Sequence, residues 1–245
     1  MKKWRKIIII VFIILIVIGG FIFIKPRLDY KNGEKYQNEE KYSKAIEEFN
    51  NAIRLNSKYE DAYFSRGCSY EGLQEYDKAI EDFSKVIDLN PDCLEAYYNR
   101  GICYYNRGKL ENTIDDLTKV LELNSDHEYA YLGRSSAYIR KIMFEEAIKD
   151  CNVAIAINPE SYYAFINKGN AYSKLKKYDE GIACYTEAIS IGPNKIDGYK
   201  NRALTYLEIE DYGSALKDLE RYLEIKPDST WVTKEITRCK AKISG

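Results

Sequence analysis

Hydrophobic and polar positions recur along the chain with a fixed period of 34 residues. Within the stretch Leu94–His127, tyrosines and small residues lie three or four positions apart, which is the spacing of one face of an α-helix. Shifting this stretch by 34 residues in either direction superposes Tyr70, Tyr104 and Tyr138. A period of this length predicts a series of similar helix-turn-helix units stacked in an array.

Six consecutive copies of this unit account for most of the chain. They span residues 26–59, 60–93, 94–127, 128–161, 162–195 and 196–229, and positions within each copy are numbered 1 to 34. A last stretch, residues 230–244, matches only the first helix of a copy and is rich in Lys and Arg. Because an array needs a polar end to cover its last apolar face, we expect this stretch to form a capping helix.

Small side chains at two positions of each copy predict a closely packed helical hairpin. Position 8 is always small, as Gly33, Gly67, Gly101, Ser135, Gly169 and Ala203. Position 20 is similarly restricted, as Ala45, Ala79, Thr113, Ala147, Gly181 and Ala215. These positions lie on either side of a turn near position 14, so two antiparallel helices can approach each other there. The second helix should end at Asn-Pro or its equivalent, because proline cannot continue a helix.

Aromatic residues follow the same period. Tyrosine stands at position 11 of every copy, and Tyr or Phe stands at position 4 of copies two to six. Since positions 4, 8 and 11 share one helical face, we interpret this stripe as core packing.

Positions 7 and 23 change together from copy to copy. Arginine and aspartate occupy them in four copies, as Arg66 and Asp82, Arg100 and Asp116, Arg134 and Asp150, and Arg202 and Asp218. Because the two positions face each other across the turn, we predict an ion pair within each of these copies. The fifth copy has Lys168 and Cys184 instead and should lack the pair. The alternative is that Arg and Asp merely cover a solvated face.

This combination of features resembles the tetratricopeptide repeat (TPR), and the resemblance covers about residues 26–244. It implies an all-α fold, a right-handed superhelical solenoid of six repeats whose first helices line a concave groove. Proteins of this family hold other proteins, so the resemblance also implies a protein or peptide partner. It does not imply an enzyme.

The groove positions of the family are 2, 5, 9, 12 and 13, which are apolar and aromatic in the middle of this chain. The candidate partner-binding residues are Phe64, Tyr98, Ile102, Tyr105, Tyr129, Leu132, Ile139, Tyr163 and Ile166. A continuous exposed patch of this kind marks a contact site. Packing between successive first helices would bury positions 5, 9 and 12 without any ligand, and both interpretations stay open. The lysine with which some TPR proteins grip chaperone tails is missing, so we do not predict chaperone-tail binding.

Residues 7–24 form one apolar run, IIIIVFIILIVIGGFIFI, after a basic tail at residues 1–6. At 1.5 Å per residue the run would form a helix of about 27 Å, close to the hydrocarbon thickness of about 30 Å. We therefore predict a single transmembrane helix that precedes the repeats. A cleaved signal peptide is the alternative, but its apolar region would be shorter and would end in a small-x-small site.

The basic tail favours an amino terminus in the cytoplasm and repeats on the other side of the membrane. The six cysteines form no close pair and are predicted to be free structural thiols, which argues for the opposite orientation, since unpaired thiols are uncommon in oxidising compartments. We therefore expect the amino terminus inside and the repeats outside, with the reverse orientation as the alternative.

Charge and motifs exclude several classes of function. The chain carries 37 basic and 38 acidic side chains, a balance that does not indicate a nucleic-acid partner. Its one histidine, His127, lies in the turn between two copies and is interpreted as a solvated turn residue. Phosphate-binding, zinc-protease and hydrolase motifs are missing, so we predict no catalytic residue, no metal and no cofactor.

These features together predict a membrane-anchored scaffold that binds a partner peptide or helix in its groove. The alternative is a targeting or import receptor whose repeats face the cytosol. An enzyme is the least favoured class, because no separate domain is left to host the chemistry.

Overall fold

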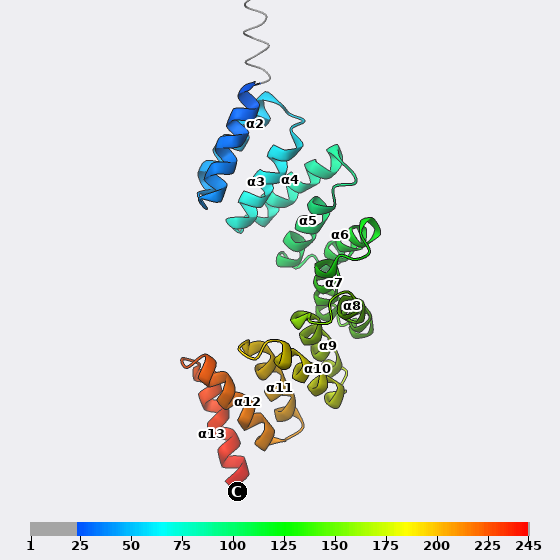
Figure 1. Ribbon diagram of the computed structural model, residues 1–245, viewed down its shortest axis with the longest axis vertical. Coiled ribbons are helices and arrows are strands. Elements are labelled where there is room, and N and C mark those ends of the chain that lie inside the picture. The colour runs from blue at the N-terminus through cyan, green and yellow to red at the C-terminus, as the bar shows by residue number, and fades with distance from the viewer. Residues whose placement is uncertain (1–23, 245) are drawn as a thin grey trace, which may run out of the picture. The chain divides into compact units, whose positions relative to one another are not determined.

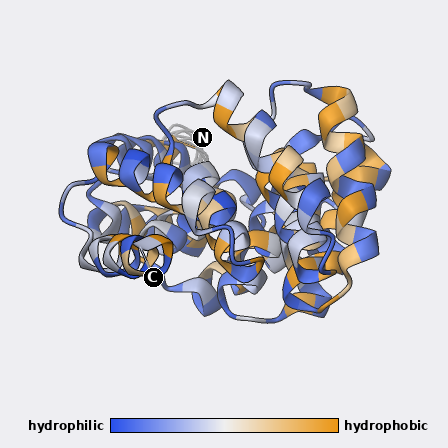
Figure 2. Cartoon of the chain, turned by 90° about the horizontal axis from the view of Figure 1, so that it is seen from below, coloured by the Kyte–Doolittle hydropathy of each residue, from blue (hydrophilic) through white to orange (hydrophobic). Residues whose placement is uncertain are grey.

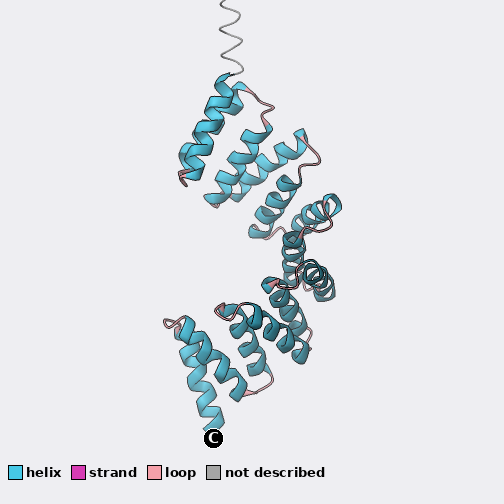
Figure 3. Cartoon of the chain, viewed as in Figure 1, coloured by secondary structure: helices cyan, strands magenta, loops and turns pink. Residues whose placement is uncertain are grey.

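The computed structural model describes residues 24–244, and every regular element among them is an α-helix (Figures 1 and 3). Residues 24–38 form the first of these helices. The helices that follow are α2 (Tyr42–Leu55), α3 (Glu60–Gly72), α4 (Tyr76–Leu89), α5 (Leu94–Asn106), α6 (Leu110–Leu123), α7 (Glu128–Arg140), α8 (Phe144–Ile157), α9 (Tyr162–Lys174), α10 (Tyr178–Ile191), α11 (Ile196–Glu208), α12 (Tyr212–Ile225) and α13 (Thr230–Ser244). Two helices thus fall within each 34-residue copy, and α13 follows the sixth.

The second helix of a hairpin ends where the backbone changes to an extended conformation. Asn90 follows α4 with φ −140° and ψ 91°, and Asn158 follows α8 with φ −133° and ψ 96°. Each of these residues precedes a proline, which disfavours the helical conformation at the residue before it. The predicted helix ends at Asn-Pro are therefore confirmed.

His127 is not the solvated turn residue that the sequence suggested. It is the residue before α7, it is half-buried, and its Nδ1 accepts a hydrogen bond of 3.1 Å from the backbone N–H of Ala130. The first N–H groups of a helix have no partner within the helix, so this bond stabilises the start of α7.

The turn inside each hairpin contains one residue with positive φ, always at position 15. These residues have φ between 56° and 74°, namely Glu40, Gln74, Gly108, Ile142, Lys176 and Glu210. Gly108 adopts this conformation at no steric cost, whereas a β-branched residue such as Ile142 is strained in it. The side chain of Ile142 is 75% exposed, so no packing compensates the strain.

The helices form two compact units, one ending at Asp116 and the other beginning at Leu117. In the first unit, α2 packs on α3, α3 on α4 and α4 on α5, and the first helices α3 and α5 also meet. In the second unit the same pattern runs from α7 to α13, with α7 against α9 and α9 against α11. Hydrophobic and hydrophilic residues are mixed along the helices, as expected where each helix has one packed face (Figure 2).

Glycine at position 8 makes room for a large aromatic side chain at position 24. A Cβ atom on Gly67 would lie 2.8 Å from Cε1 of Phe83, and one on Gly169 would lie 2.6 Å from Cε1 of Tyr185. The sixth copy has Ala203 with the smaller Leu219 at the same two positions. Positions 8 and 24 are therefore matched in size within a hairpin, a relation that was not predicted. The predicted close approach at positions 8 and 20 is also found in the fifth hairpin, where a Cβ atom on Gly181 would lie 3.3 Å from the backbone oxygen of Gly169.

All four predicted ion pairs between positions 7 and 23 are confirmed. In each pair the arginine donates from Nε and Nη2 to the two carboxylate oxygens, at 2.8 and 2.6 Å between Arg66 and Asp82. The corresponding distances between Arg134 and Asp150 are both 2.8 Å. The side chain of Asp150 is 7% exposed and that of Arg134 is 16% exposed, so the pair is largely desolvated and does not merely cover a solvated face. Within residues 24–244, Lys168 of the fifth copy forms no ion pair, as predicted.

The same arginines also reach back to the preceding copy. Nη1 of Arg134 donates to Oγ1 of Thr118 at 2.9 Å, and Nη1 of Arg202 donates to Oγ1 of Thr186 at 2.8 Å. Arg100 donates in the same way to Oγ of Ser84 at 3.0 Å. Each guanidinium therefore joins its own hairpin to the hairpin before it, a contact that the sequence analysis did not predict.

The tyrosine stripe lies at the edge of the core, where it holds these arginines. The guanidinium carbon of Arg134 lies 5.7 Å from the ring centre of Tyr131 and 5.8 Å from that of Tyr138. Both rings are half-buried. The interpretation of the stripe as core packing is confirmed, since Tyr199 is buried and Tyr70 and Tyr131 pack against buried clusters. The rings have a second role that was not predicted, because they give the cation an aromatic surface on either side.

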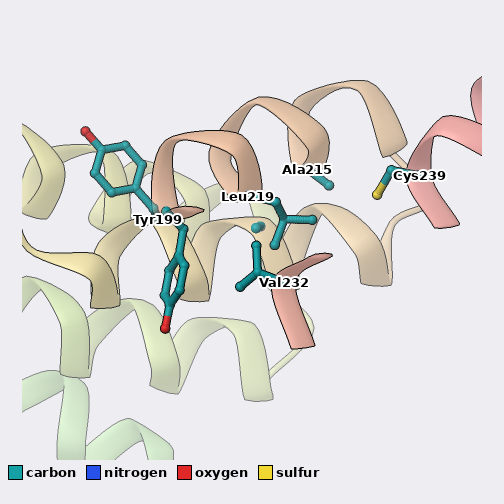
Figure 4. Packing of buried hydrophobic residues seen from close by; sticks show 7 residues of the cluster. Tyr199, Ala215, Leu219, Val232 and Cys239 are labelled. Carbon is teal, nitrogen blue, oxygen red and sulfur yellow. The ribbon is translucent and has the colours of Figure 1, made fainter. Parts of the chain in front are cut away.

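A buried cluster joins the last full hairpin to α13 (Figure 4). It contains Tyr199, Ala203, Ala215, Leu219, Tyr222, Val232 and Cys239. The rings of Tyr222 and Trp231 meet edge to face with centroids 6.3 Å apart. α13 therefore covers the apolar side of α12, as a capping helix would.

No helix within residues 24–244 combines the length and the apolar character needed to cross a bilayer. The predicted transmembrane helix at residues 7–24 and the tail at residues 1–6 lie outside the described residues, apart from Ile24. All six cysteines are free, as predicted, and Cys103, Cys151, Cys184 and Cys239 are buried.

Candidate functional site

A cleft of about 510 Å³ opens in the second unit along the first helices of the hairpins. It is bounded by α7, α9, α10 and α11 and by the turn after α9. The lining residues are Ile139, Asn170, Ser173, Lys174, Lys176, Tyr178, Tyr185, Asn201, Leu204, Thr205 and Glu208. The cleft therefore combines apolar side chains, neutral polar groups and charges of both signs.

Hydrogen bonds connect the polar residues on the floor of this cleft. Oδ1 of Asn170 accepts from the hydroxyl of Tyr185 at 2.9 Å and from Nδ2 of Asn201 at 3.0 Å. The hydroxyl of Ser173 lies 3.3 Å from that of Tyr185 and 3.1 Å from that of Thr205. Because each of these groups is bonded to its neighbours, the floor has a fixed arrangement of donors and acceptors.

The network leaves two polar groups for a ligand. Nδ2 of Asn170 and Oδ1 of Asn201 have no hydrogen-bond partner among the described residues, and neither atom is buried. An amide donor and an amide acceptor side by side match the C=O and N–H groups of a peptide backbone. The floor can therefore bind a polypeptide segment whose own backbone groups are not already paired.

Two glycines make this floor possible. A Cβ atom on Gly181 would lie 2.5 Å from Oγ of Ser173, so the alanine found at position 20 of other copies would displace that hydroxyl. Gly169 leaves space for the ring of Tyr185, as described above. The hydroxyl groups of Ser173 and Tyr185 thus depend on glycine at both small positions of the fifth copy.

Tyr185 is protonated at physiological pH and therefore acts as a hydrogen-bond donor. Burial raises its pKa to about 12, although hydrogen bonds with Ser173 and Thr205 lower it. The neutral hydroxyl donates to Asn170 and so orients the amide that faces the cleft.

The predicted groove residues of the first unit are all half-buried. They are Phe64, Tyr98, Ile102 and Tyr105. The ring of Phe64 packs against Phe83 at a centroid distance of 5.6 Å. Part of this patch therefore contributes to the packing of its own hairpin, and part of it remains accessible.

The five predicted groove residues of the second unit have different positions. The side chains of Tyr129 and Tyr163 are 64% and 54% exposed, and Ile139 lines the cleft. Leu132 and Ile166 are only 8% and 6% exposed. Leu132 packs with Ala154 and with Ala164 of the next hairpin, whereas Ile166 packs inside its own hairpin against Tyr162 and Tyr185. For these two residues the groove prediction is corrected, because both side chains are buried in the core.

The asparagines at position 6 connect neighbouring repeats. Nδ2 of Asn167 donates to Oγ of Ser135 at 2.9 Å and to Oγ of Ser136 at 3.0 Å. Asn201 donates to Asn170 in the same direction, from one first helix to the one before it. These amides fix the spacing of the first helices that form the cleft.

Most of the cleft residues were not among the predicted site residues. Asn170, Ser173 and Lys174 occupy groove positions 9, 12 and 13 of the fifth copy, and Leu204 and Glu208 occupy positions 9 and 13 of the sixth. The predicted residues are apolar and come from the middle of the chain, whereas these cleft residues are mostly polar or charged and belong to copies five and six. The groove positions of these two copies are the signal that identifies them, whatever the residue type.

The described residues contain no group of three His, Cys, Asp or Glu side chains suited to holding a metal ion. Burial raises the pKa of the thiols of Cys68, Cys103 and Cys151 to about 12, so these cysteines are protonated and poorly nucleophilic. The lining of the cleft consists of hydrogen-bonding groups, apolar side chains and charges.

Solved structures with stacked helix pairs are similar to this chain. A chain of the APC/C hetero-tetramer Cut9-Hcn1 superposes with a TM-score of 0.68 at 20% identity over 88% of this chain, which spans 43% of that chain's length. YrrB, described as a TPR protein with an unusual peptide-binding site, superposes with a TM-score of 0.61 at 19% identity, covering 79% of this chain and 97% of YrrB. MamA superposes with a TM-score of 0.61 at 27% identity, covering 66% and 94%. These similarities establish the fold.

Family models agree with the fold. Models of the tetratricopeptide repeat match residues 60–93, 94–127 and 169–234, and a model of the TPR repeat matches residues 33–74. No curated protein matches the chain. The matched segments together cover more than half of the sequence, and the helix pairs described above have the fold of a protein–protein interaction scaffold. The chain belongs to the tetratricopeptide-repeat family.

Proposed function

We propose that the protein is a membrane-anchored scaffold that binds an extended segment of a partner protein in the cleft of its second unit. The observation that carries this proposal is that Nδ2 of Asn170 and Oδ1 of Asn201, two residues that line or border the cleft, have no hydrogen-bond partner among the described residues and are not buried. An extended peptide offers unpaired backbone groups to such amides. A helix pairs its backbone groups internally, so it would use the cleft less well.

Similarity to other TPR proteins supports a peptide ligand. YrrB, which has the same fold, is described as having an unusual peptide-binding site. The cleft of this chain also has the apolar residues Ile139 and Leu204 beside its polar floor. A side chain of the bound segment can be buried against them while its backbone bonds to the amides.

A membrane anchor at residues 7–24 is part of the proposal. The run has no charged residue and follows a basic tail, which are the features of a single membrane-spanning helix. Tethering confines the repeats to a surface, which raises their effective concentration towards partners on the same membrane. We propose that the amino terminus is cytoplasmic and that the repeats lie on the other side.

A second candidate function is a targeting receptor whose repeats face the cytosol. The six free cysteines favour it, because reduced thiols persist in the cytosol. Protease added to intact cells should degrade the repeats if they lie outside, and full protection of the repeats would instead support the receptor. Neither candidate involves a catalytic residue, a cofactor or nucleic acid.

Binding can be tested with a displayed library of random peptides screened against the full chain in a non-ionic detergent. Selected peptides should bind the unaltered protein and lose about tenfold or more in affinity to the double variant Asn170→Ala, Asn201→Ala, because two backbone hydrogen bonds are removed. The matched control is Asn152→Ala, an exposed asparagine on α8. Equal binding to both variants would contradict the proposed site.

The half-buried patch of the first unit provides a separate test. Replacing Tyr98 and Tyr105 with alanine should weaken binding of a partner while the helical content stays unchanged, if these rings contact the partner. Loss of helical content, measured by circular dichroism, would mean instead that the rings serve packing between hairpins.

A further inference from the structure

The cleft in the second unit continues into a neighbouring hollow of about 310 Å³. Leu204 and Glu208 of α11 line both, so the two form one path along the second unit. The second hollow is completed by Leu207, Glu210, Tyr212, Trp231, Glu235 and Arg238. The path therefore runs from the turn after α9 to the capping helix α13.

The two ends of this path carry opposite charges. Lys174 and Lys176 line the end near the turn after α9, and both are exposed. Glu208 and Glu210 line the path towards α13 and are also exposed. Glu235 adds a further carboxylate, which Arg238 partly neutralises at 3.3 Å. A ligand lying along the path meets positive charge first and negative charge afterwards.

Apolar surface lies along the path where the charge changes sign. The side chain of Leu204 is 38% exposed and lines both hollows. Leu207 and Trp231 line the second hollow and pack against the cluster around Leu219. Burying an apolar side chain of a ligand here removes apolar surface of both molecules from water.

We propose that the partner segment has a fixed order of charge, with acidic residues at one end, apolar residues in the middle and basic residues at the other. This inference rests on the proposed peptide-binding function and deepens it by naming the chemistry and orientation of the ligand. The acidic end of the partner segment binds at Lys174 and Lys176, and its basic end binds at Glu208 and Glu210. Asn170 and Asn201 bond to the backbone between them.

Ligands of uniform charge fit this path poorly. An acidic peptide or a nucleic acid gains from Lys174 and Lys176 but then meets the carboxylates of Glu208 and Glu210. A wholly basic peptide meets the reverse problem at the lysines. Like charges brought together in a partly desolvated cleft oppose binding, so the alternation of sign selects the ligand.

Three fluorescent peptides of equal length with the same apolar centre test this inference. One has an acidic and a basic end, one has two acidic ends and one has two basic ends. At low salt, the mixed peptide should bind the full chain in non-ionic detergent about tenfold more tightly than the other two, since several exposed ion pairs contribute about 1–2 kcal/mol in all. The advantage should shrink as salt is added.

Charge reversal provides the matched variants. Lys174→Glu with Lys176→Glu should bind the peptide with two basic ends best, and Glu208→Lys with Glu210→Lys should bind the peptide with two acidic ends best. The control is Lys149→Glu with Lys217→Glu, which changes the net charge of the protein by the same amount as the first variant at exposed sites on α8 and α12. The control should keep the preference for the mixed peptide.

A photoreactive group on the acidic end of the mixed peptide defines its orientation. It should attach to the turn after α9, and attachment to α13 would overturn the inference. If all three peptides bind equally but lose affinity to Asn170→Ala with Asn201→Ala, the charge order is wrong and the proposed peptide site stands. If no peptide binds, both the inference and the proposed function of this cleft fail.

Discussion

The fourth and fifth hairpins have the same backbone pattern and use their side chains differently. In the fourth, α7 and α8 are joined by the two hydrogen bonds from Arg134 to the buried carboxylate of Asp150. In the fifth, α9 and α10 have Lys168 and Cys184 at these places, and Gly169 and Gly181 make room for polar groups instead. Of these two hairpins, the one without the ion pair has the first helix that forms the centre of the cleft.

This difference indicates a division of tasks between repeats. The buried ion pair joins the two helices of one hairpin, and a further nitrogen of the same arginine bonds to the preceding hairpin. The side chains that form these bonds are not available to a ligand. Where the pair is missing, Ser173 and Tyr185 form a polar floor in its neighbourhood, open to the cleft. Four predictions test this comparison, from the largest expected effect to the smallest.

Removing the guanidinium from the fourth hairpin should have the largest effect. Arg134→Met should lower the free energy of unfolding by about 3–5 kcal/mol, because Asp150 would remain buried without its partner. The matched change in the fifth hairpin, Lys168→Met, should cost less than about 1 kcal/mol. Urea denaturation of the full chain in non-ionic detergent measures both. Equal losses would mean that the ion pair does not distinguish the two hairpins.

Alkaline pH should weaken the fifth hairpin over a defined interval. The pKa of Tyr185 in the folded protein is about 12, and its unfolded value is about 10. The folded state therefore holds the proton more strongly, and stability should fall by about 2–3 kcal/mol as pH rises from 10 to 12.

The variant Tyr185→Phe should lack this part of the pH dependence. Cys151 occupies the same position 24 in the fourth hairpin, and its pKa is also raised to about 12 by burial. An unfolded cysteine titrates at about 8.5, so Cys151 should make the free energy of unfolding fall as pH rises above about 8.5. The variant Cys151→Ala should lack this part of the pH dependence. Stability curves that are identical for the two variants would contradict the assignment.

The size match between positions 8 and 24 predicts a smaller effect with a built-in rescue. Gly169→Ala should cost about 2 kcal/mol, since the new methyl group would overlap the ring of Tyr185. Adding Tyr185→Leu reproduces the combination of Ala203 and Leu219 in the sixth hairpin and should recover part of the loss. A double-mutant cycle on thermal unfolding measures this coupling, and additive effects would show that the two positions do not constrain each other.

The turn of the fourth hairpin offers the smallest effect, a gain in stability. Ile142→Gly should stabilise the protein by about 0.5–1 kcal/mol, because it relieves the strain of a β-branched residue at φ 64°. Gly108→Ile makes the opposite change in the third hairpin and should cost a similar amount. Thermal denaturation compares the two. A loss of stability in Ile142→Gly would mean that the isoleucine has a favourable contact in the turn.

The repeated features of the fold could be predicted from the sequence because each occurs several times. The ion pairs at positions 7 and 23 were evident, since four copies have Arg with Asp and the fifth changes both residues together. The bonds from the same arginines to the preceding hairpin were not evident, because their acceptors at position 25 include Ser84 and Thr118 and differ between copies. Hydroxyl groups on a helix surface do not reveal by themselves what they bind.

The cleft could not be predicted because it depends on exceptions to the repeat. Its floor requires glycine at both small positions of the fifth copy and a tyrosine at position 24. A repeat pattern is defined by the residues that the copies share, so Gly181 and Tyr185 cannot be told from ordinary variation between copies. Leu132 and Ile166 were selected as groove residues for the complementary reason, since their periodic apolar character indicates either an exposed patch or a core.

The direction in which the arginines reach back has a consequence for how the protein is made. A ribosome releases the amino-terminal repeats first, so when Arg134 or Arg202 emerges, its acceptor Thr118 or Thr186 is already part of the nascent chain. Each new hairpin can therefore dock onto finished structure without waiting for sequence still to be translated. The fifth hairpin has no such arginine, so during synthesis it should be less firmly attached to the fourth hairpin. It gains a bond of this kind only when α11 is made and Arg202 bonds back to Thr186.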